Sequence, residues 1–339
     1  MELADVQDSK SCGSDTVWVR PPPPAPQKPR VIGVFSNYRK KVSRMICSIC
    51  PRKCGVDREY ELGYCCSGER IKIARAALHY WEEPCISGVN GSGTIFFCGC
   101  SLGCIFCQNK AISRGEGGLE ITEDRLIEIM FELKEKGANN INLVTPDHYA
   151  PVIRKCLISA KKRGLDLPIV MNTGGYMSYA TYSLLKDVTD IWLTDYKFYS
   201  SSIAMKYANA ADYPEIAYET LCKMVEDTGE PSFDGDLMKK GVIVRVLLLP
   251  GNLKDAKNIV KLLYNNFGDK IVLSLMNQYT PPSISIEEFP ELNRKVSNKD
   301  YERLLDYAIK LGIDNAFIQE GDTAKESFIP QFDNTGVLK

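Results

Sequence analysis

The sequence predicts an α/β fold made of repeated βα units, and two observations carry this prediction. From Gly91 onward, short β-branched apolar runs alternate with segments of helical period, which is typical of a parallel sheet with crossover helices. At least six such units favour a partial or full (β/α) barrel, with a doubly wound open sheet as the alternative. A cysteine-rich loop directly follows the first run, and barrel enzymes carry their chemistry on such loops, so we favour the barrel.

The expected strands are short and rich in Val, Ile and Leu. They cover 94–97, 141–144, 169–171, 191–193, 242–249, 271–275 and 316–318. The expected helices cover 122–136, 150–163, 178–186, 214–226, 253–266 and 298–311. In the first helix Thr122 is placed to cap the start and Gly137 to end it. The segment 207–240 is long for one crossover, so we expect an insertion there near the barrel mouth.

Length and charge limit the classes of protein that this chain can belong to. Its 339 residues allow a barrel-sized domain plus a smaller module. The 42 basic and 43 acidic residues nearly balance, which disfavours a nucleic-acid partner or an anionic membrane surface. No apolar run approaches the roughly 18 residues that span a bilayer, and residues 1–10 lack a signal-peptide pattern. We therefore expect a cytoplasmic protein without a membrane partner.

Cysteine usage points to metal binding. The chain has 13 cysteines and no secretion signal, which argues against a disulfide framework. Most of them fall between Cys47 and Cys107. The expected organisation is a disordered Pro-rich tail (1–35), a cysteine-rich metal-binding module (36–90), a barrel (91–325) and a C-terminal tail (326–339). Docking of the Pro-rich tail to a proline-binding partner is the alternative to disorder.

Three cysteines with C-x3-C-x2-C spacing are the most informative motif. Thiolates from Cys100, Cys104 and Cys107 suit three corners of a [4Fe–4S] cluster and leave the fourth iron open for a small molecule. A structural zinc or three unligated thiols are the alternatives. Zinc sites usually show C-x2-C pairs and four ligands. Cys98 is a candidate fourth ligand, but on an extended chain it would point the same way as Cys100.

With Phe106 just before the last cysteine, this motif resembles that of the radical S-adenosylmethionine (SAM) superfamily. The resemblance implies a partial (β/α) barrel of the radical SAM type. It also implies that SAM chelates the open iron and is reductively cleaved to methionine and a 5′-deoxyadenosyl radical, which abstracts a substrate hydrogen. No catalytic residue is assigned beyond the cluster. The chain must then supply polar contacts for the SAM amino group, carboxylate and ribose.

Polar residues at the ends of the expected strands are the candidates for these contacts. Residues 145–148 stand where family members commonly have Gly-Gly-Glu, so the amino-group contact departs from the family pattern. Residues 172–175 resemble the Asp-Thr-Asn-Gly of glycyl-radical activating enzymes, with Asn172 in place of the acid, and residues 195–197 resemble their Asp-x-Lys. The candidates are Thr145, Asp147, His148, Asn172, Thr173, Asp195, Lys197 and Arg245.

Some of these candidates have simpler explanations. Asp195 and Lys197 can form an ordinary surface pair, and His148 can be a polar loop residue. Arg245 is harder to explain in this way, because it interrupts an apolar strand and a buried guanidinium needs an anion. The SAM carboxylate is a suitable anion. The occurrence of these residues in strand order favours a site.

The amino-terminal cysteines predict a second metal site. Cys47, Cys50, Cys54 and Cys65 are spaced C-x2-C-x3-C-x10-C, which suits either a tetrahedral zinc or a closed iron–sulfur cluster. Such a metal would stabilise a module with few apolar residues, or relay electrons or bind substrate. The basic residues around it would contact an acidic partner or only solvate the module; they are Lys40, Lys41, Arg44, Arg52 and Lys53.

A wider resemblance covers residues 45–320. Segments 47–56, 63–65, 79–84, 142–146 and 276–279 look like radical SAM proteins related to pyruvate formate-lyase activating enzyme. This implies an oxidoreductase that abstracts hydrogen from a glycine of a partner glycyl-radical enzyme, with a flavodoxin or ferredoxin as electron donor. A radical SAM enzyme acting on another peptide or a small molecule is the alternative. An iron–sulfur electron carrier or redox sensor leaves Asp195, Lys197 and Arg245 unexplained.

Overall fold

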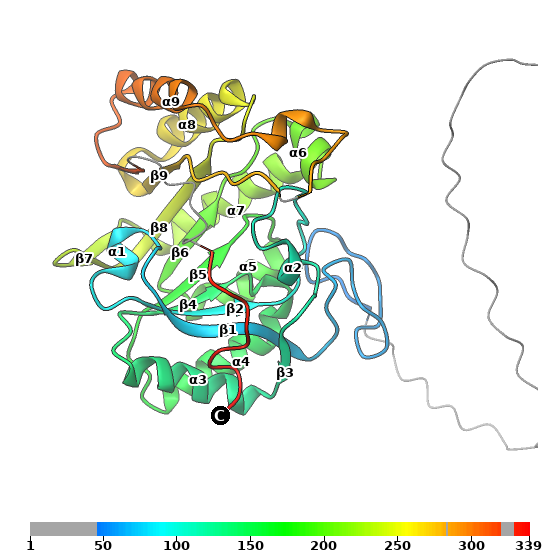
Figure 1. Cartoon of the computed structure of the whole chain (residues 1–339). Helices are drawn as coiled ribbons and strands as arrows, with labels where there is room; N and C mark the ends of the chain where they lie inside the picture. The colour runs from blue at the N-terminus through cyan, green and yellow to red at the C-terminus, as the bar shows by residue number, and fades with distance from the viewer. Residues whose placement is uncertain (1–45, 283, 320–328) are drawn as a thin grey trace, which may run out of the picture. The chain divides into compact units, whose positions relative to one another are not determined.

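The computed structural model describes residues 46–282, 284–319 and 329–339, and a ten-stranded sheet forms its centre (Figure 1). The strands follow the order β10-β9-β8-β6-β5-β4-β2-β1-β3, with β7 paired to β8. Their bounds are β1 (Ile71–His79), β2 (Ser92–Phe97), β3 (Leu119–Ile121), β4 (Ile141–Val144), β5 (Ile169–Thr173), β6 (Ile191–Asp195), β7 (Ser232–Asp234), β8 (Leu237–Leu247), β9 (Val272–Met276) and β10 (Ala316–Ile318).

Seven strands from β2 to β10 run parallel, and their spatial order follows the chain order. A doubly wound sheet would reverse its strand order at a switch point, which this sheet does not do. The predicted partial (β/α) barrel is therefore confirmed. At one edge β1 and β3 add antiparallel pairs, β1 to β2 and β3 to β1.

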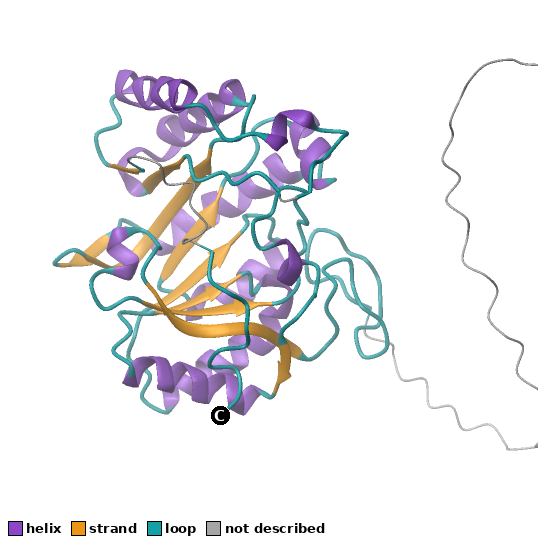
Figure 2. Ribbon diagram, in the orientation of Figure 1, coloured by secondary structure: helices purple, strands orange, loops and turns teal. Residues whose placement is uncertain are grey.

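The helices lie along the sheet and connect its strands (Figure 2). Their bounds are α1 (Pro84–Ser87), α2 (Lys110–Ser113), α3 (Glu123–Glu135), α4 (Ala150–Lys162), α5 (Tyr179–Leu185), α6 (Ser201–Ala208), α7 (Tyr213–Thr228), α8 (Leu253–Phe267) and α9 (Asn298–Leu311). Local sequence sets several starts, because Thr122, Ser178 and Ser297 each accept a hydrogen bond from the first turn of α3, α5 and α9. None of the described helices is long and apolar enough to cross a membrane.

The predicted elements from residue 122 onward match the observed ones to within a few residues, whereas β1 has no predicted counterpart. Strand β1 carries Lys72 and Arg75, and its register shifts between Ile73 and Arg75, so its apolar alternation is broken. The cysteine loop therefore follows the second strand of the chain rather than the first. Residues 71–79, which we assigned to the cysteine module, belong to the barrel sheet. The domain boundaries themselves stay a prediction, and the 1–35 tail lies outside the described residues.

The predicted insertion near the barrel mouth is wrong in its position. Strand β7 pairs with the start of β8, between Leu237 and Lys240, while β8 pairs with β6 only from Gly241 onward. The extra hairpin thus extends the amino end of β8, opposite to the end where a parallel barrel opens to its catalytic loops. Strand β8 is longer than its neighbours, and its first residues form an antiparallel hairpin with β7. Helices α6 and α7 account for the rest of the segment.

The parallel strands point alternate residues into and away from the barrel interior. Val170, Ile191, Leu193, Ile243 and Val272 form one buried cluster, while their sequence neighbours belong to the main core beneath the helices. This alternation predicts that polar residues two positions further along the same strands also face the interior. They are Asn172, Asp195, Arg245 and Ser274.

The short helix α1 fills the interior cluster from the amino-terminal side of β2. Cys85 and Ile86 pack with the inward residues of β5, β6, β8 and β9, and Ile86 is fully buried. The hairpin between β1 and β2 therefore closes one end of the barrel as a floor. At the edge of the sheet, the carboxyl-terminal segment 329–339 bonds to β1 through Ala74 and Ala76, and Val337 is buried.

We expect Ile86→Ala to lower the free energy of unfolding by about 2–5 kcal/mol, because it leaves a cavity among the inward residues of four strands. Thermal or chemical unfolding of the variant checks this. Val89→Ala is the matched control, since Val89 lies in the same hairpin and is 92% exposed, and it should change stability by less than about 0.5 kcal/mol. Equal effects of the two substitutions on stability would contradict the proposed packing of Ile86 in the barrel floor.

Candidate active site

The loop after β2 brings Cys100, Cys104 and Cys107 together at the carboxyl end of the strand. Their thiols are close enough for the charge of Cys100 to act on both other cysteines. Burial raises the pKa of Cys104 and Cys107, and the nearby Lys197 ammonium acts in the opposite direction on both thiols. Thiolate ligands need such positive charge or a metal, because burial alone favours the thiol.

Backbone contacts hold this loop in one conformation. The amide of Cys100 donates to the carbonyl of Cys65 (3.1 Å), and the amide of Ile105 donates to the carbonyl of Tyr207 (2.9 Å). Gly99 and Gly103 both have positive φ, and a Cβ on Gly99 would lie 2.0 Å from Ser67 Oγ. The loop is thus shaped by close approach to the segment that carries the amino-terminal cysteines.

Arg52 joins that segment to the cysteine loop. Its guanidinium donates to the carbonyls of Ser101 and Leu102, each at 2.9 Å. It also donates to two carbonyls at the end of α6, those of Ala208 (2.8 Å) and Asn209. The rings of Tyr64 and Tyr176 lie 4.2 and 5.1 Å from it. One side chain therefore binds four backbone carbonyls, which fixes the loop against α6.

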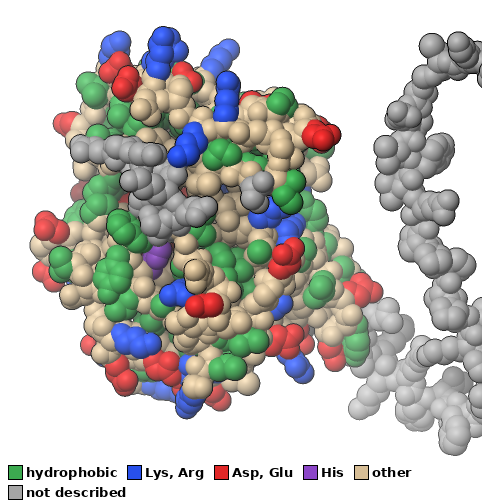
Figure 3. Space-filling view, in the orientation of Figure 1, with side chains coloured by type: hydrophobic (Ala, Val, Ile, Leu, Met, Phe, Trp, Pro, Cys, Tyr) green, Lys and Arg blue, Asp and Glu red, His purple; other side chains and the backbone are tan. Residues whose placement is uncertain are grey.

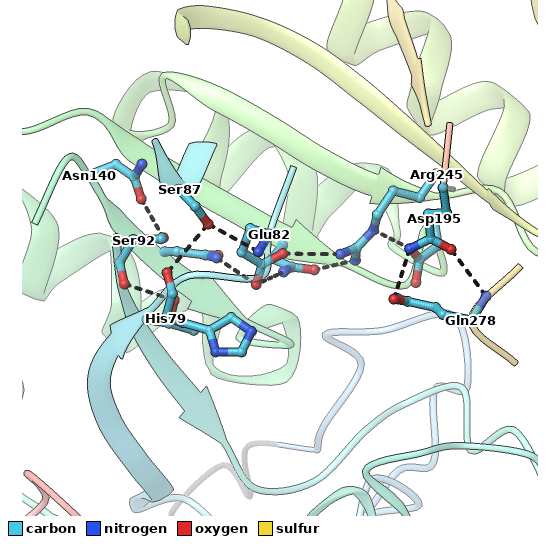
Figure 4. Close-up of polar contacts among 12 residues, drawn as sticks. His79, Glu82, Ser87, Ser92, Asn140, Asp195, Arg245 and Gln278 are labelled. Atoms are coloured by element: carbon cyan, nitrogen blue, oxygen red, sulfur yellow. Dashed lines mark hydrogen bonds and ion pairs between the residues drawn. The ribbon is translucent and has the colours of Figure 1, made fainter. Parts of the chain in front are cut away.

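A row of charged side chains runs through the barrel interior (Figure 4). Lys197 Nζ lies 2.5 Å from Asp195 Oδ2, and Arg245 Nε donates to Asp195 Oδ1 at 2.7 Å. Arg245 then reaches Glu82 (3.4 Å) in the β1–β2 hairpin. We call the side chains of Lys197, Asp195, Arg245 and Glu82 the charge row. It links the cysteine loop, through Lys197, to the floor of the barrel.

Amides complete the contacts of the charge row. Asn172 Oδ1 accepts from Arg245 at 2.5 Å, and Asn142 donates to Glu82 at 3.0 Å. Burial alone would raise the pKa of Asp195, but Arg245 and Lys197 hold it below its usual range. Burial raises the pKa of Glu82 despite the opposing effect of Arg245. Asp195 is therefore the firmly ionised carboxylate of the row.

The cysteines and the charge row line one cavity of about 1280 Å³. Most predicted cofactor-binding residues also line it: Thr145, Asp147, Asn172, Thr173, Asp195, Lys197 and Arg245. Thr145 has a φ of 57°, which a β-branched residue rarely adopts. Such strain clusters at functional sites, where the surrounding structure holds it.

Asp147 has an unsatisfied oxygen in this cavity. The residue is 4% exposed, and its Oδ1 has no hydrogen-bond partner. Burial raises the pKa of Asp147 to about 7, with Thr173 acting in the opposite direction. A buried carboxylate oxygen without a donor suits an ammonium group. It therefore fits the predicted contact to the SAM amino group in place of the missing Gly-Gly-Glu.

His148 takes a different place from the other candidates. Its ring is 2% exposed, Nε2 donates to the carbonyl of Cys98 (2.9 Å), and the residue is not part of the cavity lining. It packs on Tyr149, with ring centroids 4.2 Å apart. The imidazole thus supports the cysteine loop from behind, which makes a positioning role a better proposal than cofactor contact.

The four amino-terminal cysteines also lie near one another. Cys47, Cys54 and Cys65 all act electrostatically on Cys50, and burial raises the pKa of Cys50 to about 11. A Cβ on Gly63 would lie 3.3 and 3.4 Å from the sulfurs of Cys65 and Cys54. Within the described ranges, however, no three His, Cys, Asp or Glu side chains are arranged to hold a single metal ion, and this includes Cys100, Cys104 and Cys107. The second metal site therefore stays a proposal.

Sequence reasoning missed the functional placement of three residues. Arg52 was noted only as part of a basic stretch, and Glu82 and Glu83 only as part of the segment 79–84 that carries the family resemblance. No periodicity marks these residues. Two adjacent acids followed by a proline, between two strand-like runs, are the one local signal that such a segment enters the protein interior.

Comparison with known proteins now adds to this geometry. The family model of the radical SAM superfamily matches residues 94–221, which contain most of β2, the cysteine loop and the strands β3 to β6. The protein carries a radical SAM domain. It is therefore an enzyme with radical chemistry, and the family implies a [4Fe–4S] cluster and SAM as its cofactors.

Individual proteins match this chain with sequence identities below 30%. The chain is 28% identical over 303 residues to the uncharacterized protein MJ0674 of Methanocaldococcus jannaschii, covering 85% of this chain and 81% of that protein. It is 23% identical over 231 residues to a pyruvate formate-lyase-activating enzyme of Clostridium pasteurianum, covering 64% and 87%. The solved structure of Streptococcus suis SuiB bound to S-adenosylmethionine matches with a TM-score of 0.46 and 15% identity, over 68% of this chain and 50% of that one.

The residues on the cavity wall fit both implied cofactors. Three neighbouring thiols line it, as a cluster with one open iron requires, and the ammonium of Lys197, whose side chain is 19% exposed, acts on Cys104. An unsatisfied carboxylate oxygen on Asp147 and two cationic side chains, Lys197 and Arg245, offer partners for an amino acid moiety. These assignments are carried forward as proposals.

Arg52→Lys should lower the free energy of unfolding by about 2 kcal/mol or more, because an ammonium cannot reach four carbonyls or stack as a guanidinium does. Iron bound by the cysteine loop should also be lost faster to a chelator. Arg70→Lys is the control in the same segment, since Arg70 is exposed and makes one ion pair with Glu120. Unchanged iron release in Arg52→Lys would contradict the role of Arg52 in holding the cysteine loop.

We expect the buried His148 to make the folded protein less stable in acid. Burial and nearby Arg58 lower the pKa of His148 to about 3, so only the unfolded chain takes up its proton as the pH falls below about 6.5. Stability is thereby lost with falling pH, by about 2 kcal/mol between pH 7 and pH 5. His148→Gln, which keeps an amide donor for Cys98, should show that much less pH dependence in its unfolding free energy. Parallel curves for both proteins would contradict this.

Proposed function

We propose that this radical SAM enzyme uses Cys100, Cys104 and Cys107 as cluster ligands and abstracts a hydrogen atom from a glycine of a partner glycyl-radical enzyme. The observation that supports the site is a single cavity lined by three neighbouring thiols and the charge row. Similarity to an activating enzyme of Clostridium pasteurianum supports the substrate class. When bound, the cluster and SAM supply one-electron cleavage of a carbon–sulfur bond and a carbon radical that takes the substrate hydrogen.

The chain's own residues bind, orient and exclude water. Asp147 would accept the SAM ammonium with its unsatisfied oxygen. Lys197 and Arg245 present cationic groups to the SAM carboxylate. Asp195 forms an ion pair with each of them and holds both side chains in place. Thr145 and Thr173 lie at the ends of neighbouring strands β4 and β5, where hydroxyl or backbone groups can contact the ribose. Around α1, the apolar side chains of Ile86 and of the inward strand residues would exclude water from that part of the barrel.

A second candidate function is modification of another peptide or of a small molecule. The size of the cavity supports this alternative. Its volume of about 1280 Å³ exceeds the roughly 300–1,000 Å³ of ordinary ligand pockets, so SAM would leave room for a substrate within the barrel. On the face shown in Figure 3, acidic and basic side chains are mixed, and the balanced charge of the chain favours no nucleic-acid substrate.

Cys104→Ala should reduce 5′-deoxyadenosine formation to the background rate, measured anaerobically with SAM and a chemical reductant. Cys98→Ala is the matched control from the same loop, because Cys98 is buried outside the cavity lining and packs with Ala74 and Ile112. The control should retain iron and most of the activity. Normal product formation by Cys104→Ala would refute the cluster assignment.

The substrate class needs a separate measurement. Mixing the reduced enzyme, SAM and a glycyl-radical enzyme encoded beside its gene should produce the electron-spin signal of a glycyl radical. Deoxyadenosine formation that only some other molecule stimulates would favour the second candidate function.

A further inference from the structure

The barrel floor carries a carboxylate that the proposed chemistry does not use. Glu83 is 7% exposed, lines the cavity, and directly follows Glu82 at the start of α1. Its Oε2 atom is buried without any hydrogen-bond partner. Burial raises the pKa of Glu83, while Arg245 and Ser274 of β9 act in the opposite direction. A buried carboxylate oxygen without a donor is costly, and a ligand that donates to it would remove this cost.

The charges around Glu83 leave it without a cation of its own. Arg245 is shared between Asp195, Glu82 and Glu83, and it donates hydrogen bonds to the first two of these carboxylates. Lys197 pairs with Asp195. Among the described lining residues of the cavity, six carboxylates face two cationic side chains, Lys197 and Arg245. His79 is also in the lining, and burial lowers its pKa to about 4, so it is neutral. Two of the six, Asp234 and Asp236, are exposed on the β7–β8 hairpin, and burial raises the pKa of Glu82, Glu83 and Asp147. A ligand cation beside Glu83 would favour the ionised form of its carboxyl.

Apolar surface lies beside this carboxylate. Val272, two residues before Ser274, belongs to the interior cluster, and Phe317 of β10 packs against that cluster. Both residues line the cavity, as does Leu237 at the start of β8. A ligand with a cationic head and an aliphatic stem would match the carboxylate and these side chains together.

Glu83 borders the charge row on a different side of the barrel from Asp147. Ser274, which acts on the Glu83 carboxyl, is in register with Arg245, and Arg245 is in register with Asp195. Asp147, the proposed SAM ammonium contact, follows β4, while Ser274 lies on β9 with β5, β6 and β8 between them. Arg245 stands between Glu83 and the cysteine side of the charge row.

We propose that Glu83 binds the ammonium or guanidinium group of the substrate inside the barrel. This inference rests on the proposed function, because it places the substrate in the same cavity as the cofactors. Under that function, the reacting glycine lies near a Lys or Arg side chain that enters the barrel. A free alkylamine substrate presents the same chemistry.

The test measures binding to the anaerobically reconstituted enzyme without turnover. The probes are n-butylammonium, n-butylguanidinium and the peptide acetyl-Gly-Lys-Gly-amide, with 1-butanol and the norleucine peptide as uncharged counterparts. We expect the cationic probes to bind more tightly than their counterparts. Glu83→Gln should weaken this binding at least about tenfold, because it removes a buried charge-assisted partner. Binding of the Lys peptide without binding of the free cations would identify a peptide as the source.

Two further variants make the test specific. Asp236→Asn removes an exposed carboxylate from the lining of the same cavity and should change binding less than about twofold. Glu83→Asp keeps the charge and should bind the cationic probes more tightly than Glu83→Gln. This difference would show that the weaker binding of Glu83→Gln does not come from a general folding defect. Equal binding by wild type and Glu83→Gln would overturn the inference, as would absence of wild-type binding to every cationic probe.

The same protein preparations separate this inference from the proposed function. If wild type forms no 5′-deoxyadenosine but binds the cationic probes through Glu83, the proposed function fails and the cation site stands. If wild type forms deoxyadenosine normally and Glu83→Gln binds the probes as tightly as wild type, the cation site is refuted and the proposed function stands.

Discussion

The burial of Arg245 is the constraint on which the rest of the site depends. A guanidinium on a central barrel strand needs anionic partners, because an unpaired buried charge costs several kcal/mol. Asp195 on the neighbouring strand supplies one partner, and Glu82 supplies another from outside the parallel sheet. The β1–β2 hairpin therefore has to enter the barrel, where α1 closes the floor and Glu83 is carried into the cavity. One buried cation thus links the floor, the charge row and the cofactor side.

The cysteine loop depends on a second set of contacts that comes from the amino-terminal segment. Arg52 binds four carbonyls around it, and Cys65 accepts a hydrogen bond from the amide of Cys100. A change in the segment that carries Cys47, Cys50, Cys54 and Cys65 would therefore reach the loop directly. This gives the amino-terminal cysteine segment a structural route of influence on the cysteine loop.

Much of this architecture could be predicted from the sequence, because buried parallel strands and amphipathic helices have strong local patterns. Arg245 was recognisable as a site residue because it breaks an apolar run, and Asp195 and Lys197 because they end one. Strand β1 was missed because charged residues and a register shift break its alternation. The roles of Arg52 and Glu83 could not be predicted, since their contacts lie far away in the chain and depend on how the hairpin and the cysteine segment pack. His148 ends a strand like the other candidates, yet the 3-10 turn Asp147–Tyr149 directs it behind the loop.

An anaerobic crystal structure of the reconstituted enzyme with SAM tests the central claim most directly. The account predicts a [4Fe–4S] cluster on Cys100, Cys104 and Cys107, the SAM ammonium at Asp147, and Arg245 still joined to Asp195 and Glu82 beneath it. A cluster bound by other cysteines, or SAM placed away from the charge row, would contradict the account.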